Sequence, residues 1–203
     1  MQYDKALIEH KLERWDKFIT EYHLPEWDAI PDFGLYMDQV IALMEQYLSF
    51  IPSPAGSKEK FVTSSTVNNY VRLKVMPAPV NRKYYRIHLA YLIIILTMKQ
   101  SLSISDVQKI LPLNISDDQA HAAYDGYARM FRQLALFFNQ QVKNGISGVQ
   151  QVGREDTVDL LVIESALIAG FSKILAEKLI RLCGADTEQV LAAEKKGNGH
   201  ISG

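Results

Sequence analysis

The sequence LAYLIIILTM, residues 89–98, is the most apolar run in the chain, and the rest of the fold is expected to surround it. A surface helix needs one polar face, which this run lacks, so we predict a core helix over residues 89–99. The run is about half as long as a membrane span, so membrane insertion is not indicated.

Apolar residues at helical spacing predict helices on both sides of this core helix. On the N-terminal side they cover residues 3–21 and 35–50, and a third begins at Ser64 or Ser65 and ends near residue 74. Serine is a common N-cap, and the following MPAP sequence cannot continue a helix.

On the C-terminal side, helices are predicted over residues 103–111, 116–142 and 156–183. The sequence SDDQ has the spacing of a capping box, and KNGISGVQQVG is expected to break the long helix that it begins. Apart from a short ribbon around residues 75–85, no segment alternates as a strand does. The predicted fold class is therefore all-α.

The predicted elements divide the chain into four parts. A helix and a crossing segment occupy residues 1–34, and a central region that includes a loop at 51–60 follows over 35–113. A C-terminal helical region covers 114–185, and residues 186–203 are expected to form a flexible tail.

Basic residues are concentrated in one part of a nearly neutral chain. The net charge is −1, yet residues 58–86 contain seven Lys and Arg residues and one Glu, which leaves −7 for the remainder. Such a compact basic segment indicates an anionic partner. The single cysteine, Cys183, and the absence of an apolar N-terminal signal favour a cytoplasmic protein.

The predicted helix at 64–74 has two chemically different faces. Val67, Tyr70 and Val71 point toward a core, whereas the opposite stripe is polar. The stripe consists of Ser65, Asn68, Asn69 and Arg72. Asparagine can pair with adenine, and arginine with guanine or phosphate, so the stripe suits the major groove of double-stranded DNA. An ordinary solvated helix can carry the same stripe.

A basic, aromatic turn follows this helix. It contains Arg82, Lys83, Tyr84, Tyr85 and Arg86, whose cations and phenol hydroxyls are suited to phosphate contacts. A helix followed by a basic turn is typical of a winged helix-turn-helix. His88, just after the turn, is expected to cap or pack the next helix, with phosphate contact as the alternative.

Residues 66–111 resemble the DNA-binding domain of MerR-type regulators. The pattern is a threonine-led reading helix, prolines, a Tyr-Arg wing, an apolar helix and a short helix introduced by serine. The matching residues are Thr66, Tyr70, Arg72, Pro77, Tyr85, Arg86 and Ser103. Asn68 and Lys74 depart from it, since MerR proteins usually have arginine and glycine there.

Residues 24–113 resemble more closely a bacterial family described only as a domain of unknown function (DUF1836). The MerR likeness implies a transcriptional regulator that binds double-stranded DNA as a homodimer through long C-terminal helices. The aromatic seam at 116–142 suits such an interface, but it equally suits packing within one chain. It contains Ala120, Tyr124, Tyr127, Phe131, Leu134 and Phe138.

Other groups give weaker signals. Asp117, His121 and Asp125 share a helix face that suits a metal, although acids are also common at helix N-termini. Cys183 has no second cysteine or histidine nearby in sequence. We therefore expect no enzyme activity, no cofactor and no metal, and the small-molecule effector, if there is one, is unknown. The alternative is a helical protein-interaction module that keeps the fold without specific DNA binding.

Overall fold

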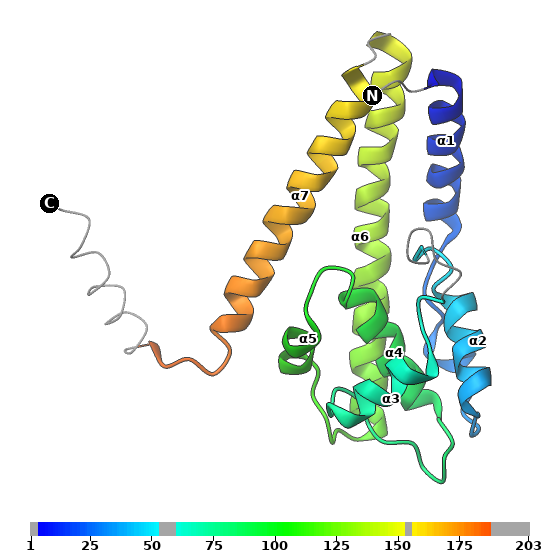
Figure 1. Ribbon diagram of the computed structural model, residues 1–203, viewed down its shortest axis with the longest axis vertical. Helices are drawn as coiled ribbons and strands as arrows, with labels where there is room; N and C mark the ends of the chain where they lie inside the picture. Colours follow the sequence, from blue (N-terminus) through cyan, green and yellow to red (C-terminus); the bar gives the residue numbers. More distant parts are fainter. Residues whose placement is uncertain (1–3, 53–59, 153–155, 188–203) are drawn as a thin grey trace, which may run out of the picture.

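The computed structural model describes residues 4–52, 60–152 and 156–187 (Figure 1). This part of the chain is helical, with two isolated β-bridges and no strand, which confirms the prediction of an all-α fold. The elements in order are α1 (Lys5–Glu21), the 3-10 helix η1 (Trp27–Ala29), α2 (Met37–Tyr47), α3 (Ser64–Arg72), α4 (Arg86–Met98), α5 (Ile104–Ile110), α6 (Asp117–Val152) and α7 (Asp156–Arg181).

Helix α4 is the centre of the core, as predicted. Every residue from His88 to Leu96 is buried, and Leu89, Leu92 and Ile93 are fully enclosed. α2 contributes Val40, Ile41 and Met44 to the same core, and α3 contributes Val67 and Tyr70. The reading helix of the prediction, α3, therefore shares one core with the most apolar helix of the described chain.

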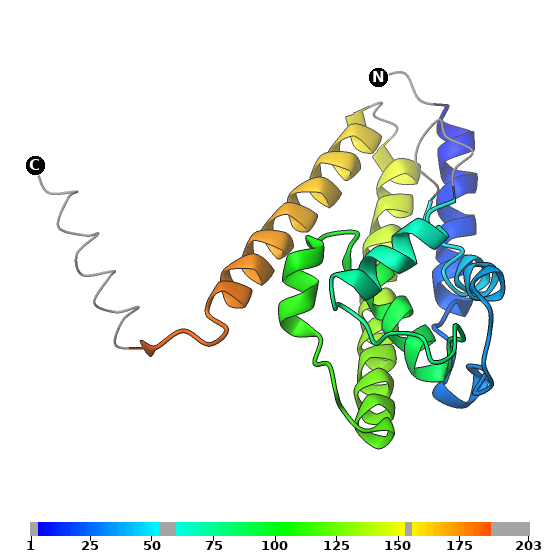
Figure 2. The same cartoon turned by 60° about the horizontal axis from the view of Figure 1, so that its bottom comes forward.

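Helix α6 runs the length of the molecule, about 54 Å at 1.5 Å per residue (Figures 1 and 2). Near its start Ala120 and Tyr124 are buried in the core, and the Tyr124 hydroxyl donates to the Pro25 carbonyl at 2.7 Å. Farther along it packs beside α1. The first half of the predicted aromatic seam thus packs within one chain.

The predicted break of this helix at residues 143–153 is wrong, because α6 continues to Val152. Gly145 faces α7. A Cβ there would lie 2.9 Å from Leu161 Cδ2 of α7, closer than real side chains approach. This glycine therefore permits close packing of two helices, although its sequence context suggested a chain break.

Helix α7 folds back beside α6 and forms an edge of the molecule on the opposite side from α1 (Figures 1 and 2). Its main contacts with the rest of the described chain are with α5 and α6. Leu161 and Ile180 face inward, whereas most of its other large apolar side chains face solvent.

The predicted helix starts are largely confirmed by hydrogen bonds. Ser116 and Gln119 form the predicted capping box, with bonds of 3.0 and 3.3 Å, and Ser103 caps α5. The N-cap of α3 is Thr63, not Ser64 or Ser65, because Thr63 Oγ1 accepts from the Thr66 amide. Most of the predicted loop at 51–60 and of the tail at 186–203 lies outside the described residues.

Across the described ranges, none of the helices combines the length and apolar character that crossing a membrane requires.

Candidate nucleic-acid interface

The two faces of α3 are divided as predicted. Val67 and Tyr70 are buried, and Val71 is half-buried against the core. Burial raises the pKa of Tyr70 to about 12, because the charged phenolate is disfavoured away from water. With these residues held inward, the opposite face of α3 is turned to solvent.

The solvent face carries the predicted polar stripe. Ser65, Asn68 and Arg72 are exposed, and Asn69 is half-buried beside them. Arg72 Nη2 donates to Asn69 Oδ1 at 2.7 Å, which occupies the Asn69 carbonyl and orients the guanidinium. Asn68 has no hydrogen-bond partner in the described ranges, so its amide is the better placed of the two to read a base edge.

The end of α3 is closed by backbone hydrogen bonds characteristic of a Schellman motif. The Lys74 amide donates to the Val71 carbonyl and the Val75 amide to the Tyr70 carbonyl. Lys74 adopts a left-handed conformation with φ of 54°, a position that glycine usually occupies. The exposed lysine therefore holds a strained position at the end of the stripe.

The predicted ribbon is a hairpin reduced to one bridge. Val80 and Lys83 exchange backbone hydrogen bonds of 3.0 and 2.9 Å around Asn81 and Arg82. These two residues have φ of 49° and 63°, as in a type I′ turn. Asparagine is common at the first position and glycine at the second, so Arg82 is an unusual residue at an exposed tip.

A second bridge attaches this hairpin to the segment before α2. Leu35 and Tyr84 exchange backbone hydrogen bonds of 2.8 and 2.9 Å. Gly34 makes the approach possible, because a Cβ there would lie 2.7 Å from Lys83 Cδ. The Lys83 ammonium lies 5.4 Å from the centre of the Tyr36 ring, a cation–π contact at the surface.

Two of the predicted phosphate-binding residues have structural positions instead. The Tyr84 ring is buried in the core, only 3% exposed, so its side chain is not presented to a partner. Tyr85 is half-buried and is the N-cap residue of α4. Of the cations in this turn, Arg82 is exposed and Lys83 is half-buried.

Arg86 is half-buried and is held by contacts to other segments. Its Nε donates to the Ile30 carbonyl at 2.8 Å, and its guanidinium lies 3.5 Å from Asp28 and 3.6 Å from Asp32. It also lies over the Trp27 ring. This cation joins α4 to the crossing segment, a role that sequence reasoning missed because its partners lie more than fifty residues away.

His88 caps α4, in agreement with the favoured interpretation. Its Nδ1 accepts from the Tyr85 amide at 3.0 Å, so Nε2 carries the proton that reaches the Ala78 carbonyl at 2.9 Å. Buried with both ring nitrogens occupied, His88 fixes the start of α4 against the preceding loop.

The arrangement gives the outer face of α3 and the adjoining turn a positive charge. No acidic residue occurs between Lys60 and Asp106 in the sequence. Arg72, Lys74 and Arg82 are exposed, and both α3 and the segment that joins it to α4 lie at the lower end of Figure 1. Beside α3, a hollow of about 490 Å³ contains the hydroxyls of Ser65 and Thr66 and the side chain of Lys99.

The predicted metal-binding group has other contacts. His121 Nε2 lies 3.2 Å from Asp125, and the imidazole stacks on the Trp27 ring with centroids 4.9 Å apart. Within the described ranges, no cluster of three acidic, histidine or cysteine side chains is suited to a metal ion. Cys183 is exposed just beyond the end of α7.

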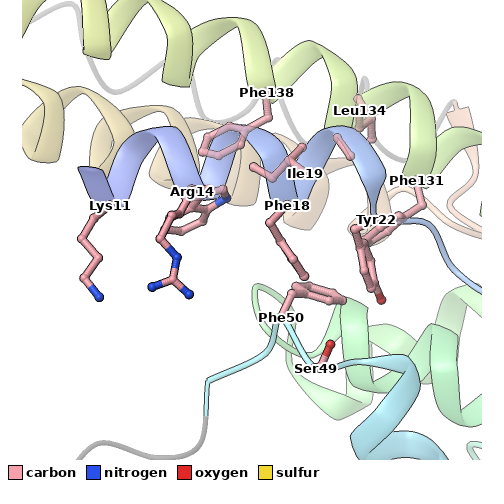
Figure 3. Close-up of a pocket in the computed structure, with 12 residues that line it drawn as sticks. Lys11, Arg14, Phe18, Ile19, Tyr22, Ser49, Phe50, Phe131, Leu134 and Phe138 are labelled. Atoms are coloured by element: carbon pink, nitrogen blue, oxygen red, sulfur yellow. The ribbon is translucent and has the colours of Figure 1, made fainter. Parts of the chain in front are cut away.

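Sequence reasoning also missed an apolar groove between α1, α6 and the end of α2. It encloses about 750 Å³, and Trp15, Phe18, Leu134 and Phe138 contribute to its lining (Figure 3). Lys11 and Arg14 lie along one end of it. The groove suits an apolar guest, and its cations suit an acidic group. Helical spacing in α1 hinted at it, but only the pairing with α6 creates the concave surface.

The comparisons with known proteins identify one family. A family model described as a domain of unknown function (DUF1836) matches residues 25–129, and no curated protein or solved structure matches. The matched part contains η1, α2 to α5 and the first turns of α6, which together build the core and the basic face. Since this match covers more than half of the 203 residues, the chain belongs to the DUF1836 family.

Proposed function

We propose that the protein is a DNA-binding transcriptional regulator with a MerR-like winged helix. In this proposal α3 enters the major groove of double-stranded DNA, where Asn68 and Arg72 contact bases. The turn at residues 80–83 lies against the phosphate backbone. Asn69 orients Arg72 through their 2.7 Å hydrogen bond, and Ser65 is placed near the start of α3 for a phosphate.

The conformation of Arg82 is the observation that carries this proposal. A non-glycine residue in the left-handed region costs about 1 kcal/mol, and glycine would fit this turn without that cost. Strained backbone positions cluster at functional sites. A cation held at an exposed tip despite the strain, beside a polar helix face, is best explained by contact with an anionic partner.

The assignment of DNA over another polyanion rests on α3. Its amide and guanidinium groups line one face of a rigid helix, and an α-helix fits the width of the major groove. The cations of the turn would then neutralise phosphates next to the bases that α3 reads. A homodimer would present two such helices to a two-fold related site.

The test begins by selecting bound sequences from random duplex DNA with the full chain. Binding of a selected and a scrambled duplex is then titrated at several salt concentrations for wild type and Arg82→Gly. We expect Arg82→Gly to weaken binding to both duplexes and to lower the slope of log affinity against log salt by about 0.9. Lys17→Gly, which changes an exposed cation on α1, is the matched control and should leave the slope unchanged.

Two results would reject the proposal. One is the absence of any duplex bound more tightly than about 100 micromolar near physiological salt, the weak end of non-specific binding. The other is equal loss of affinity in Arg82→Gly and Lys17→Gly, since the turn would then have no special role.

A protein-interaction module is the second candidate function, and the exposed apolar side of α7 favours it. Such a module would keep the helical fold while the basic face bound no specific DNA. Failure of every duplex to bind, together with a folded chain, would select this candidate.

A further inference from the structure

Helix α7 exposes a continuous apolar stripe to solvent. The large side chains on this stripe are between 49% and 69% exposed. They are Leu160, Ile163, Leu167, Ile168, Phe171, Ile174, Leu175, Leu179 and Leu182. A soluble monomer rarely exposes so much contiguous apolar surface, so the stripe indicates a protein interface.

The apolar positions of the stripe are symmetric about Phe171. Three and four residues away on either side are the pairs Ile168 and Ile174, then Leu167 and Leu175. At eight and eleven residues the pairs are Ile163 with Leu179, and Leu160 with Leu182. Steps of three, four, seven, eight and eleven return to one face of a helix.

The charges on the stripe follow the same symmetry. At seven residues from Phe171 the pair is Glu164 and Lys178, which are exposed and of opposite sign. In an antiparallel pair of helices centred on Phe171, Glu164 of each copy lies opposite Lys178 of the other. A parallel pair would place like charges together instead.

Displacement of the antiparallel pair by one heptad is unfavourable. A shift toward the N-terminus of α7 places Glu164 opposite Phe171, which buries a carboxylate against a ring. A shift toward the C-terminus places Lys178 opposite Phe171 and leaves Leu160 uncovered. The centred arrangement covers the apolar residues and pairs the charges at once.

The exposed apolar area of the stripe is large enough for a small interface. A fully exposed large apolar side chain offers roughly 60–120 Å². At 49–69% exposure the nine side chains of the stripe offer roughly 300–700 Å² per copy, the range of a small interface, since each partner buries roughly 800 Å² in a standard one.

We propose that α7 pairs antiparallel with α7 of a second copy of this chain, with a two-fold axis at Phe171. This deepens the proposed function, because a two-fold dimer would place both copies of α3 on one DNA site. In this proposal the interface is α7 and not the predicted seam of α6, because the first half of that seam is buried within the chain. The argument for the dimer uses no property of the basic face, so either proposal can fail without the other.

Cross-linking of the full chain tests the axis directly. In a Cys183→Ser background, Phe171→Cys places two thiols next to each other on the axis, and mild oxidation should give a disulfide-linked dimer in high yield. Ala166→Cys is the matched control, because this exposed position lies outside the stripe and should give little dimer. More dimer from Ala166→Cys than from Phe171→Cys would overturn the proposal.

Charge reversal tests the register and needs no DNA. By sedimentation, wild type should be a dimer at micromolar concentration, and Glu164→Lys or Lys178→Glu alone should raise the dissociation constant about threefold to tenfold. The double variant should return close to wild type. A monomeric wild type, or equal affinity in both single variants and wild type, would reject the register.

The groove on α1 and α6 is the competing partner surface for α7. Since Phe138 lies in that groove and not on α7, Phe138→Glu should leave the α7 dimer intact. Dissociation by Phe138→Glu but not by Phe171→Glu would overturn the α7 pairing and place the interface at the groove.

Discussion

Helices α4 and α7 are both strongly apolar, yet only α4 is enclosed by its own chain. From His88 to Leu96 every residue of α4 is buried, whereas α7 leaves one broad side exposed. The difference lies in their neighbours. Among the described residues, α4 packs against α2, α5 and α6 and shares its core with α3, whereas the main contacts of α7 are with α5 and α6. Apolar character alone therefore does not distinguish a core helix from an interface helix.

The same contrast follows the family boundary. The part matched by the DUF1836 model contains α4 and most of its covering, while α1, α7 and most of α6 lie outside it. The basic face thus lies within the matched part of the chain, and the exposed side of α7 lies beyond it.

The largest expected difference between α4 and α7 is in the free energy of unfolding that is lost when a leucine is shortened to alanine. Leu92→Ala opens a cavity in the fully buried α4 and should lower the free energy of unfolding by roughly 2–5 kcal/mol. Leu167→Ala on exposed α7 should lower it by less than about 1 kcal/mol in dilute protein, because no cavity forms. Denaturant unfolding below the dimer concentration range measures both, and equal losses would show that α7 is buried in the monomer.

A second expected difference concerns the two faces of α3. Asn68→Ala on the exposed face should leave stability nearly unchanged and reduce discrimination at one base pair per half-site by roughly 1–3 kcal/mol. The salt slope should stay close to wild type, since no phosphate contact is lost. Titrations against single-base variants of the selected duplex measure this, and a uniform loss over all variants would contradict base reading.

The dependence of stability on protein concentration tests whether a second copy of the chain covers α7. If α7 is covered by a partner, the midpoint of thermal unfolding should rise with protein concentration, by about 1.4 kcal/mol of apparent stability per tenfold change. Phe171→Glu should remove this dependence without unfolding the chain, because Phe171 is exposed in one copy. If the midpoint of thermal unfolding of the wild type does not change with concentration, α7 stays uncovered.

The smallest expected effect is at the end of α3. Lys74→Gly relieves the left-handed strain and should raise the free energy of unfolding by up to about 1 kcal/mol, while removing one cation from the basic face. Calorimetry of the wild type and of Lys74→Gly shows whether the free energy of unfolding rises or falls. A loss of stability would show that the lysine side chain contributes contacts that outweigh the strain.

Much of this fold was predictable because its signals are local. The apolar run of α4, the capping box at Ser116 and the two faces of α3 depend on residues a few positions apart. Ser103 and Pro112 likewise place the limits of α5 close to those observed.

What the sequence could not predict depends on distant contacts. The positions of Arg86 and Tyr84 depend on partners in the crossing segment and before α2, which local patterns do not identify. Gly145 was interpreted as a helix breaker because its neighbour, Leu161, becomes adjacent only after α7 folds back. The apolar groove likewise requires two helices separated by about a hundred residues.

The attachment of α1 to α6 has a consequence for how the chain folds. Arg132 of α6 donates hydrogen bonds to the carbonyls of Ile19, Thr20 and Tyr22, where α1 ends. α1 is synthesised before α6 and cannot dock until α6 exists, more than a hundred residues later. At about 5–20 residues per second, Ile19, which is buried in the folded chain, stays uncovered on the ribosome for several seconds. The apolar side of α1 is therefore open to chaperones while the helices between α1 and α6 are being made.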